Sequence, residues 1–245
     1  MIHSRLSRAG TADIHDLGCG TGAMARWLSP RLPCRQRWFL YDQDPVLLDI
    51  AEQSAYETRN RALVDVQVRR SDVTLLDDEH VRGADLVTAS ALLDVLTSAE
   101  LERLIAVCAT ARCPMLLALN VNGRVELTPG DPMDPPVGDA FNAHQRRTIG
   151  SERLLGPRAI TEATNALTSR GYEVLAWPSP WWLGPDQSAV AREWFTRWLT
   201  AACAQRPELV PPSAAYARRR TDQLAAGQLS VVVDHVDLLA LPPSP

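Results

Sequence analysis

The sequence contains no lysine, because all 25 of its basic residues are arginine. This absence excludes every mechanism that needs a lysine side chain, including a Schiff base, a lysine nucleophile and a lysine general base. The arginines are outnumbered by 29 acidic residues, which leaves a formal net charge of -4. Because no basic surplus is available to neutralise phosphates, the composition argues against nonspecific nucleic-acid binding.

Paired cysteines and long apolar runs are also missing. The five cysteines are scattered without a CxxC pair, so we expect neither a disulfide framework nor a zinc site. The histidines show no ligand-like spacing, and we expect no metal. No apolar stretch approaches the length of a transmembrane helix, and the first residues lack a signal-peptide core. Together these absences predict a cytoplasmic protein with reduced thiols.

The most informative feature that is present is the run DLGCGTG at residues 16–22. It follows a short apolar stretch and precedes a helical pattern that begins at Ala23. Glycines at alternate positions let the backbone turn sharply from a strand into a helix, and they leave no side chain between that backbone and a nucleotide-like ligand. Asp42 ends a second apolar run, about twenty positions beyond the last glycine, where a βαβ unit places a carboxylate on ribose hydroxyls. The pattern therefore predicts a cofactor site.

Four segments, in order along residues 13–97, resemble the motifs of class I S-adenosylmethionine-dependent methyltransferases. They are DLGCGTG at 16–22, YDQDP at 41–45, RSDV at 70–73 and ADLVTASALLDVL at 84–96. The resemblance implies that Asp42 binds the ribose hydroxyls of S-adenosyl-L-methionine, that Asp72 accepts from its adenine amino group, and that the last segment faces the transferable methyl. The residues implied to bind the cofactor are Asp16, Gly18, Cys19, Gly20, Gly22, Asp42, Gln43, Asp72, Val73 and Ser90.

Alternating strand-like and helical patterns predict the α/β class, with a three-layer sandwich around a mostly parallel sheet. The resemblance implies seven strands, of which the last, residues 229–241, is antiparallel. We expect residues 1–245 to form a single domain. Amphipathic spacing predicts a helical insertion at 186–227, between strands six and seven. Prolines and glycines predict a loop at 121–151.

The insertion and the 121–151 loop lie where they can form a cover over the substrate. In the alternative interpretation, the helical pair only packs on the sheet edge or makes a contact in a homodimer. The sequence leaves both interpretations open.

Asp94 and His144 are the candidate catalytic residues. Asp94 follows the predicted fourth strand, where a carboxylate can orient or deprotonate an acceptor; the alternative is a helix-start or surface aspartate. His144 lies in the 121–151 loop, at the carboxyl edge of the sheet where open α/β folds bind ligands, and histidine titrates near neutrality. The alternative is a solvated loop whose arginines pair with Asp131, Asp134 or Asp139.

Four further residues are predicted to contact the substrate. Asn142 and Arg146 lie beside His144, and a guanidinium there would bind a carboxylate or phosphate of the acceptor. Trp181 and Trp182, in a proline-bounded segment, would wall an apolar pocket. In the alternative interpretation these tryptophans only anchor a loop on the core.

The sequence thus predicts an S-adenosylmethionine-dependent methyltransferase acting on a small molecule, with O- or N-methylation favoured over C-methylation. The segment after the fourth strand lacks an Asn-Pro-Pro-Tyr-like motif, which argues against nucleic-acid methylation. One alternative is a methyltransferase-like subunit that binds the cofactor without catalysis. Another is a nicotinamide-dependent oxidoreductase on the same βαβ unit, whose Tyr-x-x-x-Lys version is excluded because lysine is absent.

Overall fold

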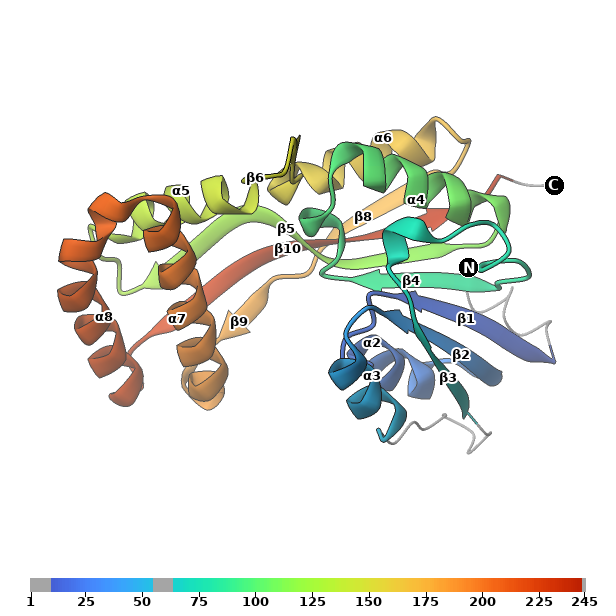
Figure 1. Cartoon of the computed structure of the whole chain (residues 1–245). Coiled ribbons are helices and arrows are strands. Elements are labelled where there is room, and N and C mark those ends of the chain that lie inside the picture. The colour runs from blue at the N-terminus through green and yellow to red at the C-terminus, as the bar shows by residue number, and fades with distance from the viewer. Residues whose placement is uncertain (1–9, 55–63, 244–245) are drawn as a thin grey trace.

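The computed structural model describes residues 10–54 and 64–243 of the chain. In these ranges an eight-stranded sheet has helices on both faces (Figure 1). Its strands are β1 (Thr11–Leu17), β2 (Arg35–Asp42), β3 (Val64–Arg70), β4 (Leu86–Ser90), β5 (Met115–Thr128), β8 (Glu173–Pro178), β9 (Trp181–Leu183) and β10 (Ser230–Leu241). The main helices are α2 (Ala23–Leu28), α3 (Pro45–Glu52), α4 (Ser98–Thr110), α5 (Asp134–Gln145), α6 (Ala159–Thr168), α7 (Ser188–Gln205) and α8 (Val210–Ala225).

The strand order is β3-β2-β1-β4-β5-β10-β8, and β9 also pairs with β10. Strands β1 to β5 are parallel, whereas β10 runs antiparallel to both β5 and β8. This confirms the mostly parallel sheet with an antiparallel last strand. The short β9 adds one strand to the seven that were expected.

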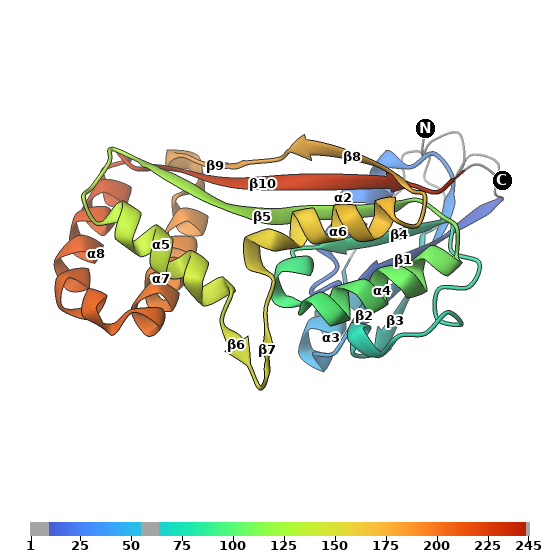
Figure 2. The ribbon, with the colours of Figure 1, turned by 90° about the horizontal axis from the view of Figure 1, so that it is seen from above.

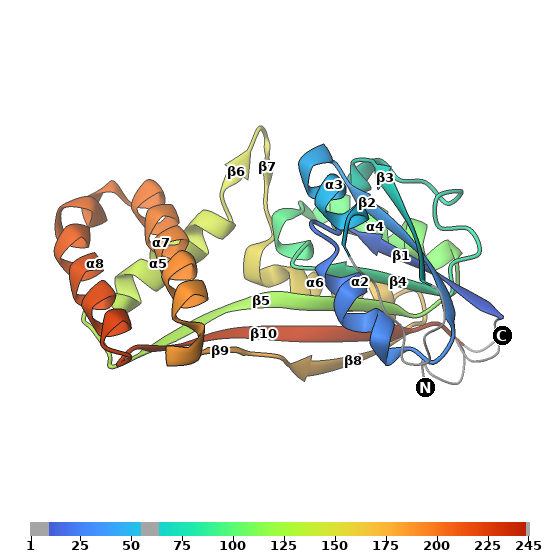
Figure 3. The ribbon, with the colours of Figure 1, turned by 90° about the horizontal axis from the view of Figure 1, so that it is seen from below.

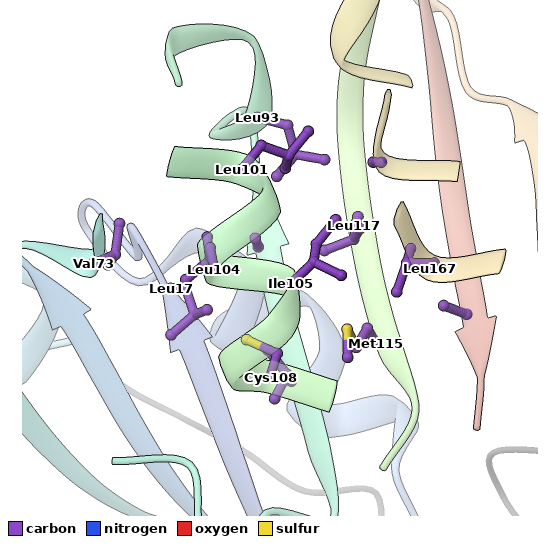
Figure 4. Close-up of a cluster of buried hydrophobic side chains, with 14 of the residues drawn as sticks. Leu17, Val73, Leu93, Leu101, Leu104, Ile105, Cys108, Met115, Leu117 and Leu167 are labelled. Atoms are coloured by element: carbon purple, nitrogen blue, oxygen red, sulfur yellow. The ribbon is translucent and has the colours of Figure 1, made fainter. Parts of the chain in front are cut away.

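Successive side chains of a strand point to opposite sides, and in the central strands both sides are buried under helices. Phe39 and Tyr41 of β2 belong to a core with α4 and α6, whereas Trp38 and Leu40 belong to a core with α2 and α3. Figure 4 shows the first core, in which Leu101, Leu104, Ile105 and Cys108 of α4 face Leu17 of β1, Met115 and Leu117 of β5, and Leu167 of α6. These layers bring the carboxyl ends of β1, β2 and β4 together on one edge.

Residues 121–147 and 181–233 form a second unit, which we call the outer lobe. Strands β5 and β10 run beyond the main sheet and carry α5, α7 and α8 at their far end (Figures 2 and 3). Phe195, Trp198, Tyr216, Leu127 and Val231 belong to a hydrophobic core of its own. The insertion at 186–227 is therefore a helical pair, as expected, and it packs on α5 and the far end of the sheet.

The prediction of a loop at 121–151 is wrong. Strand β5 continues to Thr128 because its outer half pairs with β10, from Ser230 opposite Thr128 to Val233 opposite Val125. Helix α5 follows, with Pro135 and Pro136 in its first turn, where the missing amide and fixed φ of proline are tolerated. Two of the prolines that indicated a loop, Pro135 and Pro136, therefore mark the start of a helix.

Two ion pairs join α8 to the beginning of α5. Arg220 is fully buried and donates to both carboxylate oxygens of Asp134, at 2.5 and 2.6 Å. The hydroxyl of Tyr216 donates to the same carboxylate at 2.5 Å, and the more exposed Arg219 pairs with Asp131 at 2.8 Å. The acidic residues near 131–134 thus bind arginines of α8, not those at 146 and 147.

Candidate functional site

The backbone between β1 and α2 turns sharply through three glycines. Gly18, Gly20 and Gly22 have φ values of 65°, 54° and 78°, a region that side-chain-bearing residues rarely adopt. The amide of Cys19 donates to the carbonyl of Tyr41 at 2.9 Å, which holds the turn against the end of β2. A β-carbon on Gly20 would meet nothing within 4 Å, so the backbone there faces open space. The turn therefore exposes bare backbone at the strand edge.

Asp42 fixes the turn from the neighbouring strand. Its Oδ2 accepts from the amide of Gly20 at 2.8 Å, and its Oδ1 accepts from the amide of Asp44 at 3.0 Å. Since a carboxylate offers about four acceptor sites, each oxygen can accept a second hydrogen bond. Asp42 can therefore hold the turn and bind two hydroxyls of a ligand at the same time.

A pocket of about 330 Å³ opens beside this carboxylate. It is lined by Gly18, Asp42, Gln43, Ser71, Asp72, Val73, Thr74, Leu92, Val95, Leu96 and Glu100. Five of the predicted cofactor residues lie here together: Gly18, Asp42, Gln43, Asp72 and Val73. The opposite wall comes from η3 (Leu93–Val95) and the start of α4. Most of it belongs to the segment 84–96 that was expected to face the methyl group, but the sequence interpretation named none of its pocket-lining side chains as site residues. The position of this wall directly after β4 indicates that it lies near the site. Its leucines, however, cannot be distinguished from core leucines in the sequence.

Asp72 sits at the rim of the pocket as the N-cap of η2 (Val73–Leu75). Its Oδ1 accepts from the amide and the hydroxyl of Thr74, at 2.9 and 2.7 Å. This local bonding fixes the side chain and leaves Oδ2 able to accept from a ligand amino group.

Asp16 lies beneath the turn and is almost fully buried. Its Oδ1 accepts from the hydroxyl of Thr88 at 2.6 Å, whereas Oδ2 has no partner among the described residues. Burial raises the pKa of Asp16 to about 7, and the nearby charge of Asp42 adds to that effect, while the Thr88 hydrogen bond opposes it. A buried carboxylate oxygen without a partner is costly, and a cationic ligand group would satisfy it.

The remaining cofactor candidates contribute differently. Cys19 is buried in the turn, where burial raises the pKa of its thiol, and Gly22 begins α2. Ser90 lines a second pocket of about 390 Å³, on the side of α2, and not the pocket of Asp42. The structure therefore separates Ser90 from the other pocket residues.

The two adjacent tryptophans line different pockets, so only Trp181 walls an apolar pocket as predicted, and contact of either with a substrate stays a prediction. They belong to strand β9, where neighbouring side chains point to opposite faces. Trp181 lines the pocket of Ser90, and its ring lies 5.1 Å from that of His235. Trp182 is 71% exposed and lines a separate hollow with Arg124 and Asp234.

Asn142 and Arg146 have structural contacts on α5. The side-chain amide of Asn142 donates to the carbonyl of Gly123 at 2.7 Å, which joins α5 to β5. Arg146 donates to the carbonyl of Asn142 at 3.1 Å and packs closely against Gly156. Both side chains stabilise the junction of the outer lobe, and neither lines the pocket of Asp42.

His144 and Asp94 are likewise absent from the residues that line the pocket of Asp42. His144 lies in the last turn of α5, where burial and the charge of Arg147 lower the pKa of its imidazole. Asp94 lies in η3 between residues that line the pocket, and burial raises the pKa of its carboxyl group. Their catalytic roles stay predictions.

The described part of the chain shows neither a cluster of metal ligands nor a membrane-spanning helix. Among residues 10–54 and 64–243, no group of three histidine, cysteine or acidic side chains could hold a metal ion. None of the helices in that same part of the chain is long and apolar enough to span a bilayer.

Comparisons with known proteins agree with this geometry. Residues 14–114 match the family model described as a methyltransferase domain. The chain is similar to the structure of the YcgJ protein from Bacillus subtilis, with 16% identity, a TM-score of 0.53, and coverage of 99% of this chain and 100% of that one. No curated protein matches the sequence.

Two further solved structures share less of the fold. The cyclopropane synthase MmaA2 from Mycobacterium tuberculosis is 12% identical with a TM-score of 0.48, and the match covers 98% of this chain and 82% of that one. A SAM-dependent methyltransferase from Geobacter sulfurreducens, in complex with S-adenosyl-L-homocysteine, is 14% identical with a TM-score of 0.44, covering 99% and 89%. The likeness to YcgJ shows the fold, and the family match covers the glycine turn and Asp42. Residues 14–114 are therefore similar to a methyltransferase domain, and the chain as a whole shares the fold of YcgJ.

Proposed function

We propose that the protein transfers a methyl group from S-adenosyl-L-methionine to a small molecule. The observation that carries the proposal is the hydrogen bond from Gly20 to Asp42 at the mouth of a pocket within the matched segment. This bond holds the exposed backbone and the ribose-binding carboxylate in one fixed arrangement.

The residues present fit this cofactor. Asp42 has acceptor capacity for the two ribose hydroxyls, and the free Oδ2 of Asp72 suits the adenine amino group. The unpartnered Oδ2 of Asp16 suits the ammonium of the methionine portion. When bound, the cofactor supplies an electrophilic methyl group on a sulfonium.

The chain itself has to align the acceptor and exclude water, because methyl transfer from a sulfonium is an in-line displacement. Removing a proton from a hydroxyl acceptor needs a base, and His144 remains our candidate with Asp94 as the second. The net charge of -4 supports a small-molecule acceptor over a nucleic acid. We also propose a cytoplasmic location, which is supported by the scattered cysteines of the sequence.

A second candidate function is a subunit that binds the cofactor without catalysis. It is favoured by one observation, namely that neither His144 nor Asp94 lines the pocket of Asp42. Formation of S-adenosyl-L-homocysteine in the presence of an acceptor distinguishes the two functions, because only an enzyme converts the cofactor.

Equilibrium titration of the purified protein tests the proposal. Four ligands are compared by calorimetry: S-adenosyl-L-methionine, S-adenosyl-L-homocysteine, NAD and NADP. We expect saturable binding of the two sulfur nucleosides and none of the nicotinamide cofactors at the same concentration. Preferential binding of NAD or NADP would overturn the proposal in favour of an oxidoreductase.

A further inference from the structure

A second pocket, of about 390 Å³, is lined by residues of α2, β5 and β9. Figure 3 shows α2 on the face of the sheet beside β5. The walls of this pocket are mainly apolar and are formed by Ala23, Met24, Trp27, Leu116, Ala118, Leu119 and Trp181, with Ser90 and Asp237 as the polar members. Trp27 and Trp181 are 52% and 38% exposed, which is a large aromatic area to leave in contact with water. The size and lining are typical of a site for a small apolar ligand.

This pocket adjoins the glycine turn. Leu17 pairs with Ala89 in the parallel sheet, so the next residues, Gly18 and Ser90, are neighbours at the strand ends. Gly18 lines the pocket of Asp42, whereas Ser90 lines the apolar pocket. The two pockets therefore flank the same strand ends, and a reactive group held at the turn can be approached from the apolar side.

Among residues 10–54 and 64–243, Asp237 is the only charged side chain that lines the apolar pocket. Its Oδ1 accepts from the amide of Leu119 at 2.8 Å and from the hydroxyl of Ser179 at 2.7 Å. These bonds hold Leu119 at a φ of 54°, next to a bulge in the pairing of β5 and β10. Oδ2 has no hydrogen bond from residues 10–54 or 64–243, so a carboxylate oxygen is free beside two tryptophan rings.

The free oxygen of Asp237 and the two tryptophan rings together determine which ligand charge the pocket favours. A carboxylate repels anionic acceptors and attracts an amine, and aromatic rings favour an apolar or cationic group. The guanidinium carbon of Arg31 lies 4.4 Å from the ring centroid of Trp27 and covers one face of that ring. We therefore assign the Trp27 ring to contact with the apolar part of the ligand. The polar end of the ligand then belongs at Asp237 and Ser90.

We propose that the apolar pocket of Trp27 and Trp181 binds the methyl acceptor, and that this acceptor is an apolar amine whose nitrogen lies at Asp237. This inference rests on the proposed methyl transfer. After the ammonium loses a proton to water, the nitrogen lone pair forms the N–C bond to the methyl group. The C–S bond breaks with its electron pair left on sulfur, so the sulfonium becomes a neutral thioether and the product nitrogen carries the positive charge.

Binding of three naphthalene probes to the cofactor-free protein tests the inference. They share one apolar body: 2-naphthylmethylamine is cationic at pH 7, 2-naphthylmethanol is neutral and 2-naphthoate is anionic. Calorimetry and quenching of tryptophan fluorescence measure the affinities. We expect the amine to bind about 10-fold more tightly than the alcohol, and the naphthoate to bind least, because a hydrogen bond to a charged group is worth that much.

Two matched variants, Asp237→Asn and Asp234→Asn, test which carboxylate binds the amine. In Asp237→Asn the remaining oxygen can still accept from Leu119 and Ser179, so only the free carboxylate oxygen is lost. Its affinity for the amine should fall about 10-fold, while the alcohol is unaffected. Asp234→Asn on the same strand, which lines the hollow of Trp182, should leave both affinities unchanged.

Three results would overturn the inference: no binding of the amine, equal binding of all three probes, or an Asp237→Asn variant that still prefers the amine. If Asp237→Asn does not fold, the probe series on the wild type decides together with Trp181→Ala, which should weaken the amine and the alcohol alike. Because these measurements need no cofactor, they are independent of the S-adenosyl-L-methionine titration. A failure of the probe-binding test therefore does not contradict the cofactor titration, and a failure of the titration does not contradict the probe-binding test.

Discussion

The carboxylate of Asp42 accepts a 2.8 Å hydrogen bond from the backbone amide of Gly20, across the ends of two parallel strands. The same side chain lines the cofactor pocket. Replacing Asp42 by alanine removes both the anchor of the turn and the charged acceptor for two ribose hydroxyls. We expect S-adenosyl-L-homocysteine to bind more weakly by more than about 1 kcal/mol, measured by calorimetry.

Asp44→Ala is the matched control for this variant. Asp44 caps α3 by accepting from the amide of Val46 at 2.8 Å and does not line the pocket. Its loss should lower stability by about 1 kcal/mol and leave cofactor affinity unchanged. Equal affinities for the Asp42→Ala variant and the wild type would remove Asp42 from the site.

Gly18→Ala should block the cofactor pocket. The added β-carbon would lie 3.0 Å from Cδ1 of Leu92, which lines the same pocket, at a φ of 65°. Gly83→Ala provides the comparison, because Gly83 has a φ of 79° but its β-carbon would meet nothing within 4 Å. Both variants should lose stability through backbone strain, but only Gly18→Ala should lose affinity for S-adenosyl-L-homocysteine. A parallel loss of affinity in Gly83→Ala would mean that strain alone is responsible.

Asp16 should make stability depend on pH in a predictable direction. Its pKa is raised by burial from 3.8 to about 7, so the unfolded chain ionises first as the pH rises. Its contribution to folding is fully present below pH 4 and is lost as the pH rises to about 7. Asp16→Asn lacks this loss, so its free energy of unfolding relative to wild type should increase between pH 5 and pH 8 by on the order of 2 kcal/mol. Urea unfolding at the two pH values measures this difference in free energy of unfolding. A difference that is the same at pH 5 and pH 8 would contradict the raised pKa of Asp16.

Arg220 should be essential to the stability of the outer lobe. Arg220→Met removes the buried guanidinium from the partly buried Asp134, and since breaking a fully buried pair costs about 3–5 kcal/mol, we expect a loss near the lower end of that range. Arg219→Met, one residue earlier, removes a pair whose arginine is half exposed and should cost less than about 1 kcal/mol. Urea unfolding compares the two variants. Equal losses would show that the buried pair has no special role.

Local patterns predicted the part of the site that a short segment encodes. The glycine turn and Asp42 could be found because φ requirements and strand ends leave a direct trace in the sequence. The α/β class and the mostly parallel sheet also followed, since strand-like and helical periodicities alternate along the chain. These features depend on neighbours that are close along the chain.

The errors arose where distant segments decide the structure. Strand β5 continues to Thr128 only because β10, far along the chain, pairs with it, and no local pattern shows that partner. Asn142 and Arg146 consequently lie on a helix that packs against β5, and not in a polar loop. Leu92 and Leu96 were missed for a different reason, since leucines in a pocket wall cannot be distinguished from core leucines by composition.

A crystal structure grown with S-adenosyl-L-homocysteine is the most direct test of the cofactor site. It should show the ribose hydroxyls on Asp42, the adenine against Val73 with its amino group on Asp72, and the homocysteine along the turn at Gly18–Gly22. A nucleoside bound elsewhere, or a pocket that the side chains of Leu92 and Val95 fill in its presence, would contradict the assignment.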